Sequence, residues 1–143
     1  MELDPIGYVE SALRDQAAAP KQGNEGAPDA WLVLGERVAT GIDGLRVGDD
    51  VFVLTWLPES RRDVLRVHPR DDLANPERGV FATRSSDRPN PIGLHRVRIL
   101  QIDGLRLQVR DLEAIHGTPI VDIKPVIDAD RDSGDENGTR GPA

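Results

Sequence analysis

The feature that most constrains the fold is a pair of alternating segments joined by a tight turn, in residues 94–112. Leu105 to Leu112 (LRLQVRDL) alternates apolar and polar residues without a break, and Leu94 to Ile102 (LHRVRILQI) alternates with one slip. Such alternation places apolar residues on one face of a strand, and Asp103-Gly104 is a favoured hairpin dipeptide. We therefore predict an antiparallel hairpin whose first strand points Leu94, Val97, Ile99 and Ile102 inward and His95, Arg96, Arg98 and Gln101 outward.

Other short apolar runs predict further strands, and no amphipathic helix of ten residues can be found. Val51 to Leu57 (VFVLTWL) is nearly continuous, which predicts a strand covered on both faces. Pro125 in the last run implies an edge or a bulge, and Ile42 to Val47 predicts a turn or a single helical turn. Many short strands joined by Gly/Pro turns favour a mainly β fold, a small β-barrel of about six to eight strands. The remaining predicted strands are Ile6–Ser11, Trp31–Leu34, Arg62–Val67 and Ile120–Ile127.

Length and composition predict one folded domain followed by a tail. A chain of 143 residues is large enough to bury a core. We assign the domain to residues 1–127. Residues 128–143 are acidic, Gly-rich and almost free of large apolar groups, so we predict a disordered tail. The segment Arg14 to Pro28 has no periodicity, and loops of this length are usually functional or mobile.

Several classes of site are excluded by composition. The chain has no cysteine, and its three histidines show no ligand spacing, so we expect no metal. No Gly-rich loop joins a strand to a helix, which excludes a Rossmann dinucleotide site and a P-loop. A Ser/His/Asp triad lacks a supporting nucleophile motif. No apolar run approaches the roughly 20 residues that cross a bilayer, and the acidic start lacks a signal-peptide core, so we expect a cytoplasmic protein.

Charge is unevenly distributed along the chain. The total is −7, with −7 in residues 1–60 (4 basic, 11 acidic), +5 in residues 61–110 (11 basic, 6 acidic) and −5 in residues 111–143 (3 basic, 8 acidic). A basic central third in an acidic protein fits an anionic ligand or a nucleic-acid backbone that meets one face. Alternatively, the arginines simply decorate the solvent faces of strands.

A stiff, polar segment, FATRSSDRPNPIGL, covers residues 81–94. Phe81 and Ala82 read as the end of a short buried strand. Prolines on either side of Asn90 hold the chain extended, so Arg84 and Arg88 lie on a rigid loop that is suited to binding. The alternative is a structural turn with surface arginines.

A second unusual segment, EAIHGTPIVDIKP, covers residues 113–125. Asp122 and Lys124 fall on one face of its predicted strand. Such a pair is commonly a surface ion pair. Together with the arginine-bearing loop, it would instead supply both signs of charge to one cleft.

The motifs GVFATRSSDRPNPIGL and HGTPIVDIKP closely resemble those of the TsaA-like family, also called the TrmO type. The resemblance covers Ile6 to Ile127 and includes a Pro20-Lys21-Gln22 triplet similar to that family's Pro-Arg-Gln loop. It implies a small β-barrel, usually a homodimer, that binds S-adenosyl-L-methionine without a Rossmann domain. It also implies methylation of N6 of threonylcarbamoyladenosine, the modified adenosine beside the anticodon of certain tRNAs.

The resemblance also assigns residues by position. Cofactor contacts are expected from Arg84 and Leu94, from a lid formed by Pro20, Lys21 and Gln22, and from Arg110, Asp111, Leu112 and Glu113. Asp122 and Glu113 are candidate catalytic bases. Independently of the resemblance, the few aromatic residues leave Tyr8, Trp31 and Trp56 as the candidates for stacking a base, and Trp56 fits the core better. Substrate contacts are expected at the signature positions Arg88, Asn90, Thr118 and Lys124.

The chain departs from the family pattern at several positions. Pro58 stands where the family usually has a histidine, Ser86 where proline is common, His116 replaces an acid, and Val126 replaces a tyrosine. Three functions therefore stay open: a tRNA methyltransferase, a methyltransferase of the same fold for a small molecule, and a non-catalytic cofactor- or RNA-binding dimer.

Overall fold

The computed structural model describes residues 1–14 and 26–127, and it confirms that the protein is mainly β. The predicted lid triplet Pro20-Lys21-Gln22 and the predicted tail, residues 128–143, lie outside the described residues. The domain boundary at residue 127 stays a prediction.

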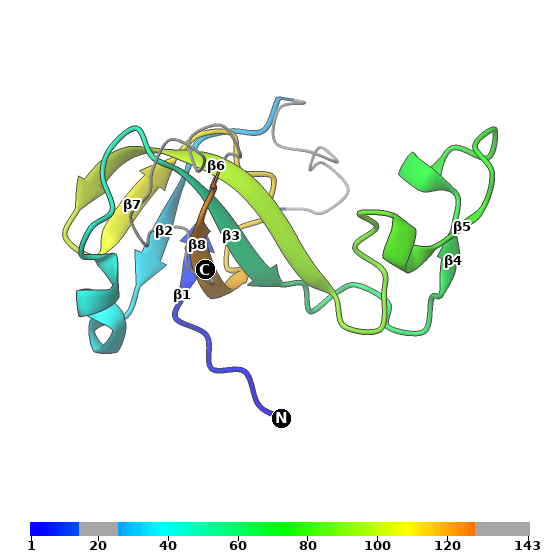
Figure 1. Cartoon of the computed structure of the whole chain (residues 1–143), viewed down its shortest axis with the longest axis horizontal. Helices are drawn as coiled ribbons and strands as arrows, with labels where there is room; N and C mark the ends of the chain where they lie inside the picture. The colour runs from blue at the N-terminus through cyan, green and yellow to red at the C-terminus, as the bar shows by residue number, and fades with distance from the viewer. Residues whose placement is uncertain (15–25, 128–143) are drawn as a thin grey trace.

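Six strands form one antiparallel sheet, bonded in the order β1-β2-β7-β6-β3-β8 (Figure 1). β8 returns to β1 through two residue pairs, Gly7 with Ile120 and Tyr8 with Pro119, so the sheet closes on itself along a short seam. Beyond that seam β8 pairs only with β3, which leaves Pro125 at a free edge, as its lack of an N–H predicts. The strands are β1 (Gly7–Glu10), β2 (Ala30–Leu34), β3 (Asp50–Trp56), β6 (Ile92–Asp103), β7 (Arg106–Val109) and β8 (Pro119–Pro125).

The core fills the inside of this sheet, because every second residue of each strand points there. On β3, Val51, Val53 and Thr55 are fully buried, while the alternate residues between them are half-buried. The run from 51 to 57 is therefore covered well on one face and only partly on the other. Other fully buried side chains of the core are Val9, Leu32, Ile99, Leu107, Val109, Leu112 and Ile120.

The predicted hairpin is confirmed, but the inner face of its first strand was partly wrong. Asp103 pairs with Arg106 across the turn, and Gly104 has a φ of 61°. On β6 the buried residues are His95, Val97 and Ile99, whereas Leu94 is 38% exposed. The slip in the alternation is a register shift between Ile99 and Gln101, not a break before Val97. The prediction for Leu94 was wrong because His95, a polar residue, takes the inward position that the apolar pattern had assigned to Leu94.

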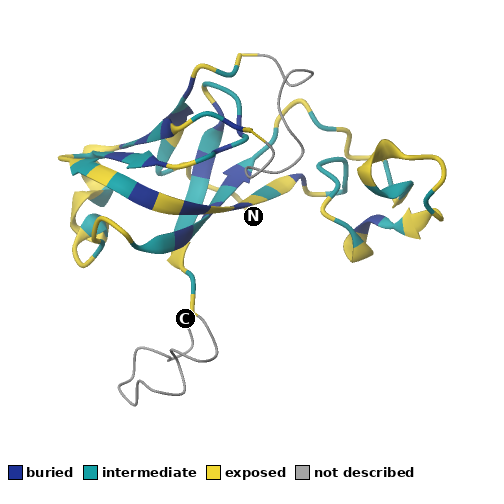
Figure 2. Cartoon of the chain, turned by 90° about the horizontal axis from the view of Figure 1, so that it is seen from above, coloured by how far each residue is buried: buried dark blue, intermediate teal, exposed yellow. Residues whose placement is uncertain are grey.

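Residues 57–91, here called the arm, connect β3 to β6 and project away from the sheet (Figure 1). The arm contains the two-residue strands β4 (Arg66–Val67) and β5 (Arg78–Gly79) and the 3-10 helices η4 (Pro69–Asp71) and η5 (Val80–Ala82). Val80 and Pro91 are its only buried residues, and Figure 2 shows how much of it is exposed.

Two strand predictions in the arm were wrong. Of the predicted strand Arg62–Val67 only β4 forms, and Phe81, predicted to end a buried strand, is 79% exposed in η5. Both errors have one cause, because short apolar runs form strands only where a core faces them. Elsewhere, a 3-10 helix, η3 (Glu36–Ile42), ends where the turn at 42–47 was expected. Within the described ranges no helix is long and apolar enough to span a membrane.

Candidate functional site

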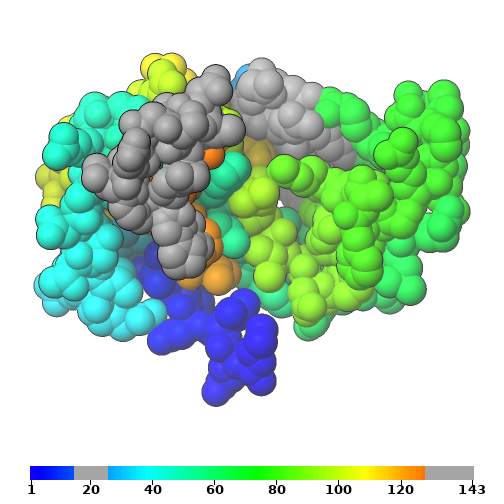
Figure 3. All heavy atoms as spheres, in the orientation of Figure 1, coloured from blue at the N-terminus to red at the C-terminus, as the bar shows by residue number. Residues whose placement is uncertain are grey.

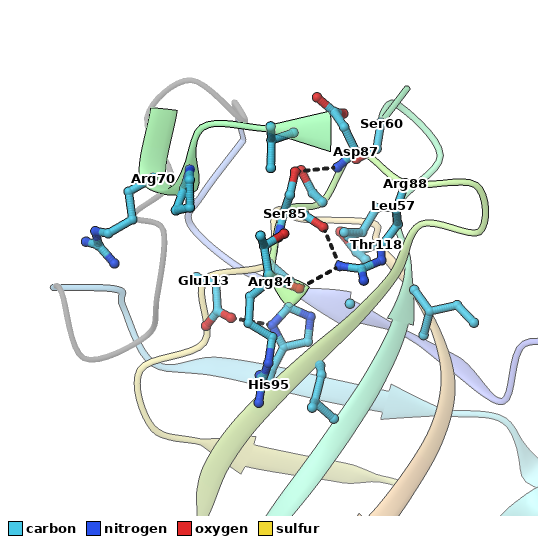
Figure 4. Close-up of a pocket in the computed structure, with 18 of the residues that line it drawn as sticks. Leu57, Ser60, Arg70, Arg84, Ser85, Asp87, Arg88, His95, Glu113 and Thr118 are labelled. Atoms are coloured by element: carbon cyan, nitrogen blue, oxygen red, sulfur yellow. Dashed lines mark hydrogen bonds and ion pairs between the residues drawn. The ribbon is translucent and has the colours of Figure 1, made fainter. Parts of the chain in front are cut away.

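A large cleft of about 1520 Å³ lies between the arm and one end of the sheet. Its walls come from the arm, from the beginning of β6 and from the loop that joins β7 to β8. In Figure 3 the arm forms a separate lobe beside the sheet, and Figure 4 shows the side chains of the cleft. Since small-molecule sites usually measure about 300–1,000 Å³, the cleft has room for more than one small ligand. Predicted site residues that line it are Arg84, Arg88, Leu94, Arg110, Asp111, Glu113 and Thr118.

The two arginines of the stiff loop differ in what they contact. The Arg88 guanidinium donates hydrogen bonds to the backbone carbonyls of Val80 (2.9 Å), Thr83 (3.1 Å) and Ser85 (2.9 Å). Arg84 is exposed, lines the cleft, and makes no side-chain hydrogen bond or ion pair with a described residue. Arg88 therefore holds the loop in shape, whereas Arg84 presents an available cation to the cleft.

Asn90 also serves the shape of the loop. Its side-chain oxygen accepts a hydrogen bond from Arg62 (2.9 Å), which also donates to the Pro89 carbonyl (2.7 Å) and lies over the Trp56 ring at 5.4 Å. Sequence reasoning missed Arg62, since nothing in its spacing to the loop indicated this contact. Direct substrate contacts by Arg88 and Asn90 stay predictions.

The segment 110–113 forms the wall opposite the arm. Asp111 has a φ of 55°, a left-handed conformation tolerated by aspartate. Its backbone N–H donates to Asp29 Oδ1 (3.2 Å). The Leu112 side chain is fully buried in the core, so only its backbone is available to a ligand. Arg110, exposed at the cleft, makes no side-chain hydrogen bond or ion pair within the described chain.

Behind Glu113 lies a chain of polar side chains that sequence reasoning missed. His95 Nδ1 is 2.5 Å from Glu113 Oε1, and His95 Nε2 is 2.7 Å from Thr55 Oγ1. Thr55 is fully buried, the His95 side chain is 6% exposed and the Glu113 side chain is 17% exposed. The only signal in the sequence was a histidine at a position where the alternation, shifted by one residue, demands a core side chain.

The structure separates Asp122 and Lys124 from this cleft. Their residue pairing with Leu54 and Phe52 places them on the outer face of the sheet, with Lys124 Nζ 3.9 Å from Asp122 Oδ2. The predicted common face is thus confirmed. Neither residue lines the cleft, so the expectation that they join the arginine-bearing loop around it is not met within one chain.

Two further positions of the HGTP motif are held by local hydrogen bonds. The Thr118 hydroxyl, 4% exposed as a residue, donates to the Ile115 carbonyl at 2.7 Å. His116 lines the cleft and accepts a hydrogen bond from the Ser11 N–H at Nδ1 (3.3 Å). His116 therefore ties this loop to the end of β1.

Charge near the cleft is mixed. Where the sheet lines the cleft, a hydrogen bond from Arg98 Nε (2.9 Å) and a second one from Arg96 hold the pKa of Asp50 below its ordinary value. No group of histidine and carboxylate side chains in the described ranges has a geometry that could hold a metal ion.

The Ser60 hydroxyl, which belongs to a residue that lines the cleft, is buried without a hydrogen-bond partner among the described residues.

Comparison with known proteins gives consistent matches. The model of the tRNA-methyltransferase O N-terminal domain family matches residues 8–131. An S-adenosyl-L-methionine-binding protein of Archaeoglobus fulgidus is 42% identical over 124 residues, 87% of this chain and 88% of the relative. A probable S-adenosyl-L-methionine-binding protein of Methanocaldococcus jannaschii is 48% identical over 126 residues, 85% of this chain and 89% of the relative.

Among solved structures, TrmO from Pseudomonas aeruginosa superposes with a TM-score of 0.72 at 28% identity. The alignment covers 100% of this chain and 63% of that chain, so this protein spans less than two thirds of the solved enzyme's length. The shared part is therefore the sheet and arm described above.

Proposed function

The chain belongs to the tRNA-methyltransferase O N-terminal domain family, and from this membership we propose that it is an S-adenosyl-L-methionine-dependent methyltransferase that acts on tRNA. More specifically, we propose that it methylates N6 of threonylcarbamoyladenosine beside the anticodon. The observation that carries the proposal is the family match over residues 8–131, because it includes both long motifs and every described residue of the cleft.

The side chains of the cleft fit the proposed cofactor. S-adenosylmethionine has a carboxylate, an ammonium and a sulfonium group, and an apolar adenine edge. Arg84, which has no partner among the described residues, suits the carboxylate, while Asp111 suits the cationic groups. Half-exposed apolar surface for the remainder comes from Leu57, Ile92 and Leu94.

When bound, the cofactor supplies a methyl group on an electrophilic sulfonium, so the chain's own task is alignment and proton removal. The N6–H of an acylated adenosine is acidic for an amine, and a carboxylate can accept its proton. We propose Glu113 for this role rather than Asp122, because Glu113 opens on the cleft and Asp122 lies on the outer face of the sheet.

An RNA substrate is supported by the rim of the cleft as well as by the family. Phe81 is a large aromatic side chain that is 79% exposed at the cleft, although sequence reasoning had placed it inside. Exposed aromatic rings are the usual platforms on which unpaired bases stack. Nearby Arg70 and Arg78 line the same cleft and suit phosphate groups.

A methyltransferase for a small molecule is the second candidate. It is favoured by the net charge of −7, which opposes a polyanion, and by the departures at Pro58, His116 and Val126. The homodimer inferred from the family resemblance remains a proposal in both cases.

The test is mass spectrometry of tRNA nucleosides from cells with and without the gene, followed by methylation of the deficient tRNA with the pure protein. We expect the N6-methylated nucleoside to be lost in the deletion and regained in vitro. The protein with Glu113→Gln serves as the control for contaminating activity. If calorimetry shows cofactor binding but tRNA is unchanged, the small-molecule candidate is favoured.

A further inference from the structure

Thr55, His95 and Glu113 form a continuous hydrogen-bonded chain that runs from the core to the cleft (Figure 4 shows its outer two members). Exposure increases along the chain, from 0% for Thr55 to 6% for the His95 side chain and 17% for that of Glu113. His95 and Glu113 both line the cleft, but the His95 ring is almost buried, so the Glu113 carboxylate is the most accessible of the three groups to a ligand, and Thr55 lies behind them.

Glycine at position 93 leaves the space in which the Thr55 and His95 side chains meet. A side-chain carbon placed on Gly93 would lie 2.8 Å from His95 Nε2 and still closer to Thr55 Oγ1. Any residue other than glycine would break the contact between them. An unpaired buried imidazole or hydroxyl destabilises a fold. The hydrogen bond between Thr55 and His95 therefore requires glycine at position 93.

The contact between His95 Nε2 and Thr55 Oγ1 can form whether the ring is neutral or protonated. An ionised carboxylate can only accept, so His95 Nδ1 carries the hydrogen in its contact with Glu113. A neutral ring then accepts at Nε2 from the Thr55 hydroxyl, and a protonated ring donates to the same oxygen, because a hydroxyl does both. A valine at position 55 has no hydroxyl, so it could form a hydrogen bond with neither the neutral nor the protonated His95 ring.

We propose that His95 is a positioning residue that fixes the Glu113 carboxylate toward the acceptor, with Thr55 fixing the ring from behind. The inference rests on the proposed function, in which Glu113 accepts the proton of the acceptor N–H while the bonding electrons stay on nitrogen. Other charged side chains that line the cleft with Glu113 are Arg84, Arg110 and Asp111, and His116 is a further titratable group there.

A pair of substitutions at position 95 separates positioning from simple packing. In His95→Asn the amide N–H can stand in place of Nδ1–H and still donate to Glu113, whereas in His95→Gln the amide reaches toward Thr55 instead. We expect turnover on tRNA from gene-deleted cells to fall about tenfold or more in His95→Gln and several-fold less in His95→Asn. Glu113→Gln should lose on the order of 10²-fold. Affinity for S-adenosylmethionine should stay within about threefold in the two His95 variants.

Two measurements guard against loss of folding. Thr55→Ser keeps the hydroxyl and Thr55→Val removes it, so only the valine variant should reproduce the His95→Gln defect. In the cofactor-free protein, long-range ¹H–¹⁵N spectra should show the His95 ring protonated at Nδ1. A neutral ring protonated only at Nε2 would place the proton on Glu113 and overturn the proposal.

The outcomes also separate this inference from the proposed function. If the wild type methylates tRNA and His95→Asn is as impaired as His95→Gln, the positioning role is wrong while the function stands. If the wild type binds cofactor but methylates no tRNA, the proposed function fails and the positioning role fails with it.

Discussion

The sheet and the arm are held together by different forces. In the sheet, fully buried apolar side chains from every strand meet in one core. In the arm, where two residues are buried, the chain is held by guanidinium groups: Arg62 and Arg88 donate to loop carbonyls, and Arg66 pairs with Glu77 at 2.8 Å. Burial of apolar surface is non-directional, whereas these hydrogen bonds specify one geometry.

The difference explains where the candidate site lies. Glu113 and His95 come from the end of the rigid sheet, and Arg84 comes from the hydrogen-bonded arm, so the cleft joins both regions. Substitutions in the sheet should therefore remove the fold. Those in the arm should change the shape of the site while the sheet survives.

The largest expected effect is on the sheet. Ile99→Ala leaves a cavity in the closed core, and we expect a loss of about 2–5 kcal/mol in the free energy of unfolding. Urea denaturation measures it. The matched control is Leu73→Ala in the arm, because Leu73 is 81% exposed and its truncation should change stability by no more than about 0.5 kcal/mol. Similar losses in both would contradict the contrast between the two regions.

An intermediate effect is expected at Arg88. Removing its three hydrogen bonds with Arg88→Ala should destabilise the arm by about 1–3 kcal/mol. Amide hydrogen exchange should accelerate in residues 80–90 and stay unchanged in β6. Arg78→Ala, an exposed arginine of the same arm, is the control. Faster exchange throughout the sheet would show that the two regions do not unfold separately.

The smallest effect is expected from acid. Asp50 is held ionised by Arg98 and Arg96, so its folded pKa lies below its ordinary value. It therefore adds stability above the ordinary carboxylate pKa, and this contribution is lost as pH falls through the lower folded value. Asp50→Asn should flatten this acidic part of the stability–pH curve in urea titrations. Asp43→Asn, at an exposed carboxylate without an ion pair to a described residue, should leave the curve as it is.

The sheet was largely predictable and the arm was not. Alternation found the hairpin at residues 94–112 because a core faces it, and the error at Leu94 arose only because His95 takes an inward position. In the arm, Phe81 has the composition of a buried strand but no core to enter. Its exposure depends on long-range contacts that no local pattern encodes.

The motifs that form the site could be recognised in the sequence, but the roles of their individual residues could not. Arg84 and Arg88 have the same chemistry four residues apart, yet Arg84 lines the cleft without a side-chain partner among the described residues, whereas Arg88 donates to three carbonyls. Likewise Asp122 and Glu113 were equal candidates for the base, and strand register separates them. Thr55 and His95 face each other only through the pairing of β3 with β6.

Calorimetric titration with S-adenosylmethionine tests most directly whether the cleft binds the cofactor with Arg84 as an anchor. We expect micromolar binding by the wild type and, since a charge-assisted hydrogen bond contributes about 1.5–3 kcal/mol, roughly ten- to hundredfold weaker binding by Arg84→Ala. Arg84→Lys should recover little, because an ammonium cannot reproduce the two-pronged guanidinium contact. The melting temperature without ligand should barely change in either variant, because Arg84 is exposed. Absence of binding by the wild type, or unchanged affinity in Arg84→Ala, would contradict this binding mode.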